Sequence, residues 1–180
     1  MVYFSGFGFR GERGLFAWIL KDCGDYDMAG FSYGALKALE CAYGKAKEGQ
    51  RVQKLMLISP CMLALKPPAF KRLQVLSYKK DPKGYMQTFF KNIGWADMLQ
   101  KNSNLENYTH LGSAEDLEDL LYTPLDPKKL EFLQSKGVCV EVFLGLADPL
   151  LEPKEALGFF KPHACVWQFK GYGHFLQENS

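Results

Sequence analysis

The feature that most constrains this chain is a short apolar run that leads directly into a serine flanked by glycines. Residues 26–34 read Tyr-Asp-Met-Ala-Gly-Phe-Ser-Tyr-Gly, so that Gly30 and Gly34 each stand two places from Ser32. Apolar residues at helical spacing follow at once over residues 35–42. The order strand, Gly-x-Ser-x-Gly, helix predicts a strained turn at the serine. The two glycines have no side chain, so that neighbouring backbone segments can pass close to this turn. The alternative is an ordinary glycine turn with an idle serine.

Strand and helix patterns alternate on both sides of this turn. Apolar strands predicted beside it alternate with helices that have one apolar face, which indicates parallel strands joined by helical crossovers. The sequence therefore predicts an α/β fold of about five parallel strands with helices on both faces. Besides the strand that enters the turn, the predicted strands are Val2–Phe4, Val52–Ser59, Val138–Leu144 and Ala164–Phe169, and the later helices are Pro127–Ser135 and Pro153–Phe160.

The middle of the chain interrupts this alternation. Proline and glycine punctuate helical patterns at roughly Ala69–Tyr78, Pro82–Ile93 and Ala114–Tyr122, and no strand pattern is evident between residues 61 and 136. We expect one domain over residues 1–180, with a helical lid inserted at residues 62–125. Open α/β sheets bind ligands at the carboxyl ends of their strands, and the lid is expected to cover that edge.

Composition bounds the chain further. With 180 residues, of which 47% are apolar, it can bury one full core. Neither a basic leader nor an apolar run of membrane-spanning length is evident, so we expect a cytoplasmic protein that does not bind membranes. The five cysteines are odd in number and never spaced as Cys-x-x-Cys. They are expected to be reduced and mostly buried, Cys139 and Cys165 within apolar strands, which argues against a disulfide frame or a metal site.

A serine hydroxyl becomes a nucleophile only when a base removes its proton and a carboxylate orients that base. In chains with this type of turn the order is serine, then acid, then histidine. Ser32, Asp148 and His174 fit that order, and each follows a predicted strand. Asp148 taken alone also fits an ordinary turn before a proline. Of the other two histidines, His110 falls in the insert and His163 precedes the last strand.

Two backbone N–H groups are needed to hold the oxyanion that forms during acyl transfer. One normally comes from the residue after the nucleophile, here Tyr33, and the other from the loop after an early strand, here Phe7. The side chain of Phe7 is also expected to line an acyl pocket. A plain buried aromatic is compatible with both roles.

Net charge is only +2, but it is unevenly distributed along the chain. Residues 62–101 hold eight basic and two acidic residues, whereas acids dominate residues 102–160. Two solvated faces would explain this pattern. A basic surface for an acidic partner is the alternative.

Five motifs together resemble the small bacterial pimeloyl-acyl-carrier-protein methyl ester esterases of biotin biosynthesis, within the α/β-hydrolase superfamily. They are Phe4-Ser5-Gly6-Phe7-Gly8, Gly30-Phe31-Ser32-Tyr33-Gly34, Leu57-Ile58-Ser59-Pro60, Gly145-Leu146-Ala147-Asp148 and Gly171-Tyr172-Gly173-His174. The resemblance implies hydrolysis of a carrier-bound methyl ester without cofactor or nucleic acid. It also implies that basic lid residues bind the acidic acyl carrier protein; the candidates are Lys71, Arg72, Lys79, Lys80, Lys83 and Lys91.

The chain departs from that family in two ways. Ser5-Gly6 stands where many relatives have His-Gly, so the contribution of that histidine must come from elsewhere. A strand and a helix that usually precede the serine turn are absent, which predicts a sheet whose spatial order follows the sequence. A thioesterase or a general short-chain carboxylesterase would share the same triad. A noncatalytic binding protein of the same fold is a further alternative.

Overall fold

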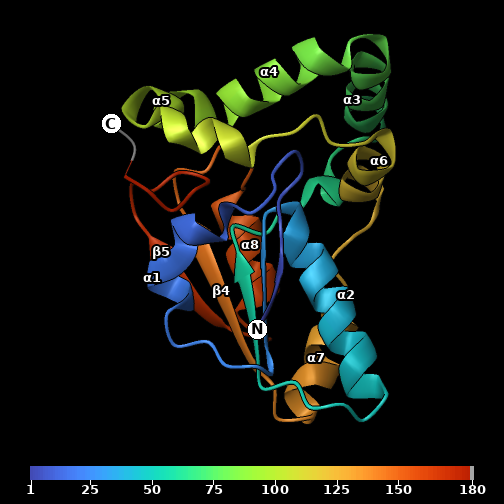
Figure 1. The fold of residues 1–180 in the computed structure, drawn as a ribbon. Helices are drawn as coiled ribbons and strands as arrows, with labels where there is room; N and C mark the ends of the chain where they lie inside the picture. Colours follow the sequence, from blue (N-terminus) through green and yellow to red (C-terminus); the bar gives the residue numbers. More distant parts are fainter. Residues whose placement is uncertain (179–180) are drawn as a thin grey trace.

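The computed structural model describes residues 1–178, and its core is a five-stranded parallel sheet (Figure 1). The strands lie side by side in the order β1-β2-β3-β4-β5, so the predicted α/β fold and the sequential sheet order are both confirmed. Their bounds are β1 Val2–Phe4, β2 Asp27–Phe31, β3 Lys54–Ile58, β4 Cys139–Gly145 and β5 Cys165–Phe169. All four neighbouring pairs are parallel, as expected when helices form the connections.

Helices cover both faces of the sheet because the central strands are apolar on both faces. Along β3, Leu55 and Leu57 belong to one core cluster, and the alternating Met56 and Ile58 belong to the other. The first cluster lies under α2 (Tyr33–Lys47), α7 (Pro127–Ser135) and α8 (Pro153–Phe160). The second lies under η1 (Glu12–Phe16), α1 (Ala17–Leu20) and α5 (Trp95–Lys101).

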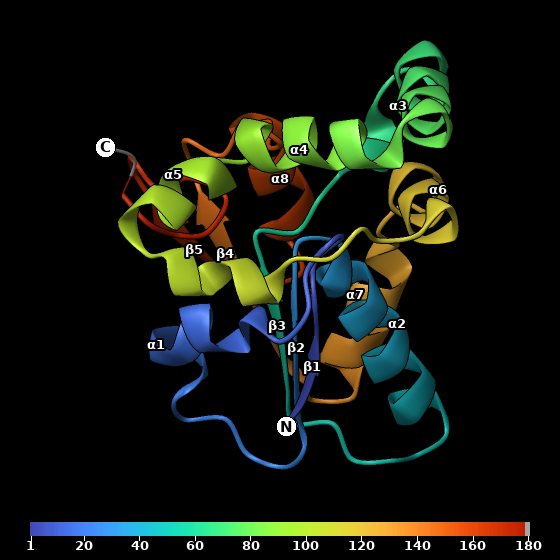
Figure 2. The same ribbon diagram turned by 45° about the horizontal axis from the view of Figure 1, so that its top comes forward.

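Helices also fill the long connection between β3 and β4. Figures 1 and 2 show α3 and α4 lying beyond the carboxyl ends of the strands, with α6 beneath α3. The three expected helices are present as α3 (Pro68–Lys80), α4 (Pro82–Asn92) and α6 (Ala114–Tyr122). The connection also contains α5 and two 3₁₀ segments, η2 (Leu63–Leu65) and η3 (Ser103–Tyr108). These were not predicted, because elements this short show too few turns for apolar periodicity to be recognised.

The cysteines differ in part from expectation. Cys139 and Cys165 are exposed, so the prediction that they are buried was wrong. Each is the first residue of its strand and lies beside a charged residue, Lys54 and Glu141 respectively, in the polar rim of the sheet. All five thiols are free, and residues 1–178 contain no group of His, Cys, Asp or Glu side chains that could hold a metal ion. Within the same residues, no helix is long and apolar enough to cross a membrane.

Candidate active site

Ser32 lies in a strained turn between β2 and α2. Its backbone has φ 56° and ψ −117°, a conformation that side-chain-bearing residues rarely adopt, and the helix begins at the next residue. A Cβ on Gly30 would lie 2.0 Å from the carbonyl oxygen of Gly34, and a Cβ on Gly34 would lie 2.0 Å from that of Phe4. Only glycine fits at either position. The turn predicted from Gly-x-Ser-x-Gly is therefore present.

Loops after two other strands bring an acid and a base to this serine. Nε2 of His174, after β5, lies 3.0 Å from Oγ of Ser32, and its Nδ1 lies 2.6 Å from Oδ2 of Asp148, after β4. All three residues are at most 5% exposed. The N–H of Leu150 donates to the other Asp148 oxygen at 2.8 Å. A carboxylate at Nδ1 places the imidazole proton there and leaves Nε2 free to accept the proton of Ser32.

The other two histidines make their contacts elsewhere. Nε2 of His110 lies 3.1 Å from the carbonyl oxygen of Phe9, and Nδ1 of His163 lies 3.9 Å from Glu131. Of the three histidines, the structure therefore brings His174 to the serine, as the sequence order indicated.

Cys61 also reaches the serine, although no sequence motif pointed to it. Its Sγ lies 3.2 Å from Oγ of Ser32, on the loop that leaves β3. Burial raises the pKa of the Cys61 thiol to about 12, so the thiol is protonated at neutral pH. It can therefore donate a weak hydrogen bond to the serine oxygen but does not supply a thiolate nucleophile. The one available signal was its position after a central strand.

The buried carboxylate of Glu12 forms a hydrogen bond with the loop after β1, which contains Phe7. Oε1 of Glu12 accepts hydrogen bonds from the N–H of Gly6 at 3.0 Å and from the hydroxyl of Tyr3 at 3.1 Å. Glu12 is completely buried, and burial together with this carboxylate raises the pKa of Tyr3. Sequence reasoning missed Glu12, because a charged residue eight places after the end of a strand resembles an ordinary surface position. It anchors the loop at Gly6.

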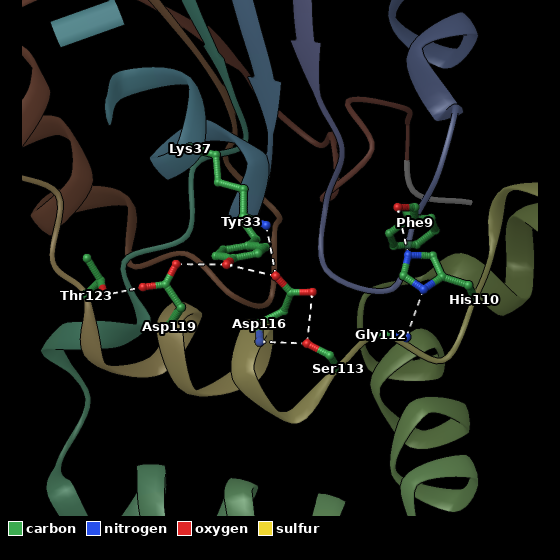
Figure 3. A network of polar contacts seen from close by, with 9 residues as sticks. All are labelled: Phe9, Tyr33, Lys37, His110, Gly112, Ser113, Asp116, Asp119 and Thr123. Carbon is green, nitrogen blue, oxygen red and sulfur yellow. Dashed lines mark hydrogen bonds and ion pairs between the residues drawn. The ribbon is translucent and has the colours of Figure 1, made fainter. Parts of the chain in front are cut away.

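A polar network surrounds the side chain of Tyr33, the residue after the nucleophile (Figure 3). Its hydroxyl lies 2.8 Å from Oδ2 of Asp119 and 3.1 Å from Oδ1 of Asp116, both on α6. Burial raises the pKa of this phenol, and the hydrogen bond to Asp119 raises it further. The Lys37 ammonium lies 2.8 Å from Asp116. Although burial opposes it, this contact keeps the pKa of Asp116 below its usual value.

An apolar cavity of about 720 Å³ lies between the lid and the loop after Asp148. Phe7 does not line it; its ring is buried against Tyr78 and meets the ring of Phe89 edge-on at 5.5 Å. Phe89 lines the cavity and separates it from the Phe7 ring. The apolar lining includes Phe70, Phe89, Leu117, Leu120, Leu121 and Leu150.

Two of the six basic residues expected to bind a partner are engaged within the lid. Nζ of Lys71 donates to the carbonyl oxygen of Ala64 at 2.6 Å, and Lys79 forms an ion pair with Glu118 at 2.8 Å. The remaining four are exposed and form no ion pair within residues 1–178; they are Arg72, Lys80, Lys83 and Lys91.

No protein-family model matches this chain, and no curated protein is detectably similar in sequence. Solved structures are similar in fold. BpoC from Mycobacterium tuberculosis is 13% identical with a TM-score of 0.63 over 97% of this chain and 84% of its own. A monoacylglycerol lipase from Paleococcus ferrophilus is 14% identical, with a TM-score of 0.58. The similarity covers 96% of this chain and 84% of the lipase.

A hydrolase from Oleispira antarctica is also 14% identical, with a TM-score of 0.59 over 83% of this chain. The present chain spans only 58% of that protein's length, which agrees with a trimmed version of the fold. At these identities the likeness concerns architecture alone. The chain has the α/β-hydrolase fold.

Proposed function

We propose that this chain is a serine carboxylesterase that hydrolyses the methyl ester at the distal end of a pimeloyl chain carried on acyl carrier protein. The observation that carries hydrolysis is the continuous contact from Ser32 Oγ through His174 to Asp148, with distances of 3.0 and 2.6 Å. The methyl ester and its carrier rest on the family resemblance. A cytoplasmic location, where such a carrier would be met, belongs to the same proposal.

The proposed reaction begins when His174 Nε2 takes the proton of Ser32 and the serine oxygen attacks the ester carbonyl. The N–H groups of Phe7 and Tyr33 hold the oxyanion. Its collapse breaks the bond to the methoxy group, which takes the proton from His174 and leaves as methanol. Water then gives a proton to His174 and attacks the acyl-enzyme. The second collapse breaks the bond to Ser32 Oγ, which takes that proton from His174, and releases the carboxylic acid. Asp148 remains ionised throughout.

The surroundings of the triad support an acyl substrate on an acidic carrier. The 720 Å³ cavity is lined mainly by apolar side chains, and its lining includes Pro149 and Leu150, the two residues that follow Asp148 in the chain. Transfer of an acyl chain from water into this cavity would be favourable, because it buries apolar surface. The exposed cations of α3 and α4 lie on the outside of the same lid, where an acidic carrier would be attracted to them.

The central test replaces the nucleophile. Ser32→Ala should lower kcat by about 10⁴-fold, because the triad acts as a unit. Methanol release from methyl pimeloyl carrier protein measures turnover, and a fluorophosphonate probe measures labelling of Ser32. Ser135→Ala, at the exposed end of α7, is the matched control and should retain full activity. A loss of only a few-fold in Ser32→Ala contradicts the proposal.

The same assay separates the substrate classes. Loss of the methyl group with the carrier thioester intact supports the proposal. Release of the acyl chain from the carrier, with its methyl ester retained, would show a thioesterase. Turnover of small soluble esters alone would show a general carboxylesterase. Failure of the probe to label Ser32 would show a noncatalytic protein.

The carrier surface is tested by charge reversal. Arg72→Glu combined with Lys80→Glu should raise KM for the carrier-bound substrate, and more strongly at low salt, because screening weakens the attraction. Hydrolysis of a short soluble ester should not change. Lys21→Glu with Lys128→Glu alters net charge equally on exposed positions outside the lid and is the matched control. Equal losses on both substrates would indicate damage to the fold instead.

A further inference from the structure

One continuous segment contacts both elements that would supply the oxyanion donors. This segment, residues 108–123, is called the strap; it runs from the end of η3 through α6 (Figure 3). One end lies against the loop that contains Phe7, and the other holds the side chain of Tyr33. These two donors belong to different elements, the loop after β1 and the start of α2, so neither element by itself sets their separation.

At Tyr33, a single phenol bridges two carboxylates. Asp116 and Asp119 stand three places apart and therefore on one face of α6. A phenol has one proton and can donate fully to one carboxylate at a time, so the short contacts to both require that they share it. The Lys37 ammonium lies 4.3 Å over the Tyr33 ring and offsets part of the negative charge. The phenol is thus the central link between α2 and α6.

Both carboxylates are also fixed from the α6 side. The hydroxyl of Ser113, the residue before the helix, accepts from the N–H of Asp116 at 3.0 Å and donates to its Oδ2 at 3.1 Å. At the other end of the helix, the hydroxyl of Thr123 donates to Oδ1 of Asp119. Because each carboxylate is held at its other oxygen, the position of the Tyr33 ring is defined rather than adjustable.

At the loop, the strap is joined by backbone and by one imidazole. The N–H of His110 donates to the carbonyl oxygen of Gly8 at 2.9 Å. The N–H of Gly112 donates to Nδ1 of His110 at 2.9 Å, which means that Nδ1 carries no proton. The ring proton therefore lies on Nε2, which donates to the carbonyl oxygen of Phe9 at 3.1 Å. His110 therefore joins the strap to this loop through both ring nitrogens and its backbone N–H.

Packing completes the contact with Phe7 itself. Gly112 lies so close to the Phe7 ring that a Cβ there would come within 2.8 Å of it. From α3, the hydroxyl of Tyr78 donates a hydrogen bond to the carbonyl oxygen of Gly112 at 3.2 Å. This bond holds the strap beside the Phe7 ring. The residue whose N–H would hold the oxyanion is thus confined by the strap on its side-chain side.

We propose that the strap positions the oxyanion hole, with Asp116 and Asp119 acting through Tyr33 and His110 acting through the loop at Phe9. The inference rests on the proposed function. These side chains are positioning residues, because they do not touch the reacting atoms. They keep the two N–H donors at the separation that the oxyanion requires, and an interaction needed only in the transition state changes kcat rather than KM.

Tyr33→Phe tests the first link, since it keeps the ring and the backbone N–H but removes the shared hydroxyl. We expect kcat to fall about tenfold with KM within about twofold, a part of the 10²–10³-fold that loss of a whole oxyanion donor costs. Affinity for a trifluoromethyl ketone, which mimics the tetrahedral intermediate, should fall by the same factor as kcat/KM. Tyr43→Phe, on the same helix, is the matched control and should leave both unchanged.

His110→Ala tests the second link. It should lower kcat and leave KM nearly unchanged, as expected for Tyr33→Phe. Asp119→Asn keeps an oxygen that can accept the Tyr33 proton, so it should retain more activity than Asp119→Ala. Thermal unfolding of each variant identifies any loss that arises from the fold alone. A merely structural role would lower the amount of active enzyme, measured by fluorophosphonate titration, and leave kcat per labelled site unchanged; that result would overturn the inference.

Failure of the inference and failure of the proposed function give different results. Inactive Ser32→Ala together with unchanged kcat and ketone affinity in Tyr33→Phe and His110→Ala would overturn the strap's role and leave the esterase proposal standing. An active Ser32→Ala would overturn both. Parallel losses of kcat and ketone affinity in both strap variants would support the inference.

Discussion

The sheet and the lid place their apolar side chains in opposite ways. In β2 and β3 nearly every residue is buried, and alternate side chains enter the two cores. In α3, by contrast, Leu73 and Leu76 are 60% and 65% exposed. Figures 1 and 2 show α3 at the edge of the molecule, away from the sheet. The sheet therefore positions the triad through burial, whereas α3 leaves apolar side chains exposed on its outer face.

The two regions also differ in how they are held. Strand pairing and close-packed side chains hold the sheet and the serine turn. Part of the lid shares these two cores, as Leu117 and Trp95 show. Its outer helix α3 is joined to the strap by polar contacts, such as Lys79 with Glu118 and Tyr78 with Gly112. Substitutions in the sheet should consequently affect stability strongly, and most substitutions on the outer lid should affect it weakly.

Gly30→Ala should produce the largest effect. The added Cβ would lie 2.0 Å from a backbone oxygen, so the turn cannot form without moving α2. We expect a loss of more than about 4 kcal/mol in the free energy of unfolding, as for other backbone-incompatible substitutions. Gly44→Ala, within α2, adds a Cβ that meets no atom within 4 Å, so it should stabilise the folded protein by about 0.5–1 kcal/mol. Urea titration measures both, and a normal Gly30→Ala midpoint would contradict the assigned turn.

Leu57→Ala against Leu76→Ala compares sheet and lid directly. Leu57 is fully buried in β3, and its truncation should cost about 2–5 kcal/mol through lost burial and a cavity. Leu76 lies on the outer face of α3, and the same change should stay within about 0.5 kcal/mol. Chemical unfolding curves provide the comparison. Similar losses at the two positions would mean that α3 is covered in solution.

Glu12→Ala should have an intermediate effect. It leaves the N–H of Gly6 and the hydroxyl of Tyr3 without their acceptor, and each orphaned buried donor costs about 1–3 kcal/mol. Glu12→Gln retains a carbonyl oxygen and should be milder in both stability and kcat. Equal behaviour of the two variants in thermal unfolding and ester hydrolysis would show that charge, rather than the hydrogen bonds, holds the loop.

The smallest effect concerns pH. The pKa of Asp116 is lower in the folded protein than in the unfolded chain. The contact of its carboxylate with Lys37 therefore stabilises the folded protein fully above the unfolded-state pKa of about 4. That contribution is lost as pH falls from about 4 through the lower folded-state pKa. Asp116→Asn should therefore reduce the drop in Tm between pH 7 and pH 3. An unchanged drop would show that other carboxylates dominate acid unfolding.

Much of this molecule could be predicted from local patterns. The Gly-x-Ser-x-Gly turn, the parallel strands and the helices at 114–122, 127–135 and 153–160 follow from periodicity and from the position of proline. The chain order of Ser32, Asp148 and His174 predicted which side chains would meet. This succeeded because loops at the carboxyl ends of parallel strands converge on one edge of the sheet, whatever the remaining sequence.

Contacts between separate elements were decided by the tertiary structure alone. The thiol of Cys61 at Ser32, the carboxylate of Glu12 under Gly6 and the aspartates of α6 at Tyr33 join residues that no local pattern relates. Phe89 rather than Phe7 lines the cavity for the same reason, since the packing of α4 determines which ring faces inward. Periodicity assigns a residue to a face of its own element, but only the assembled fold determines what that face meets.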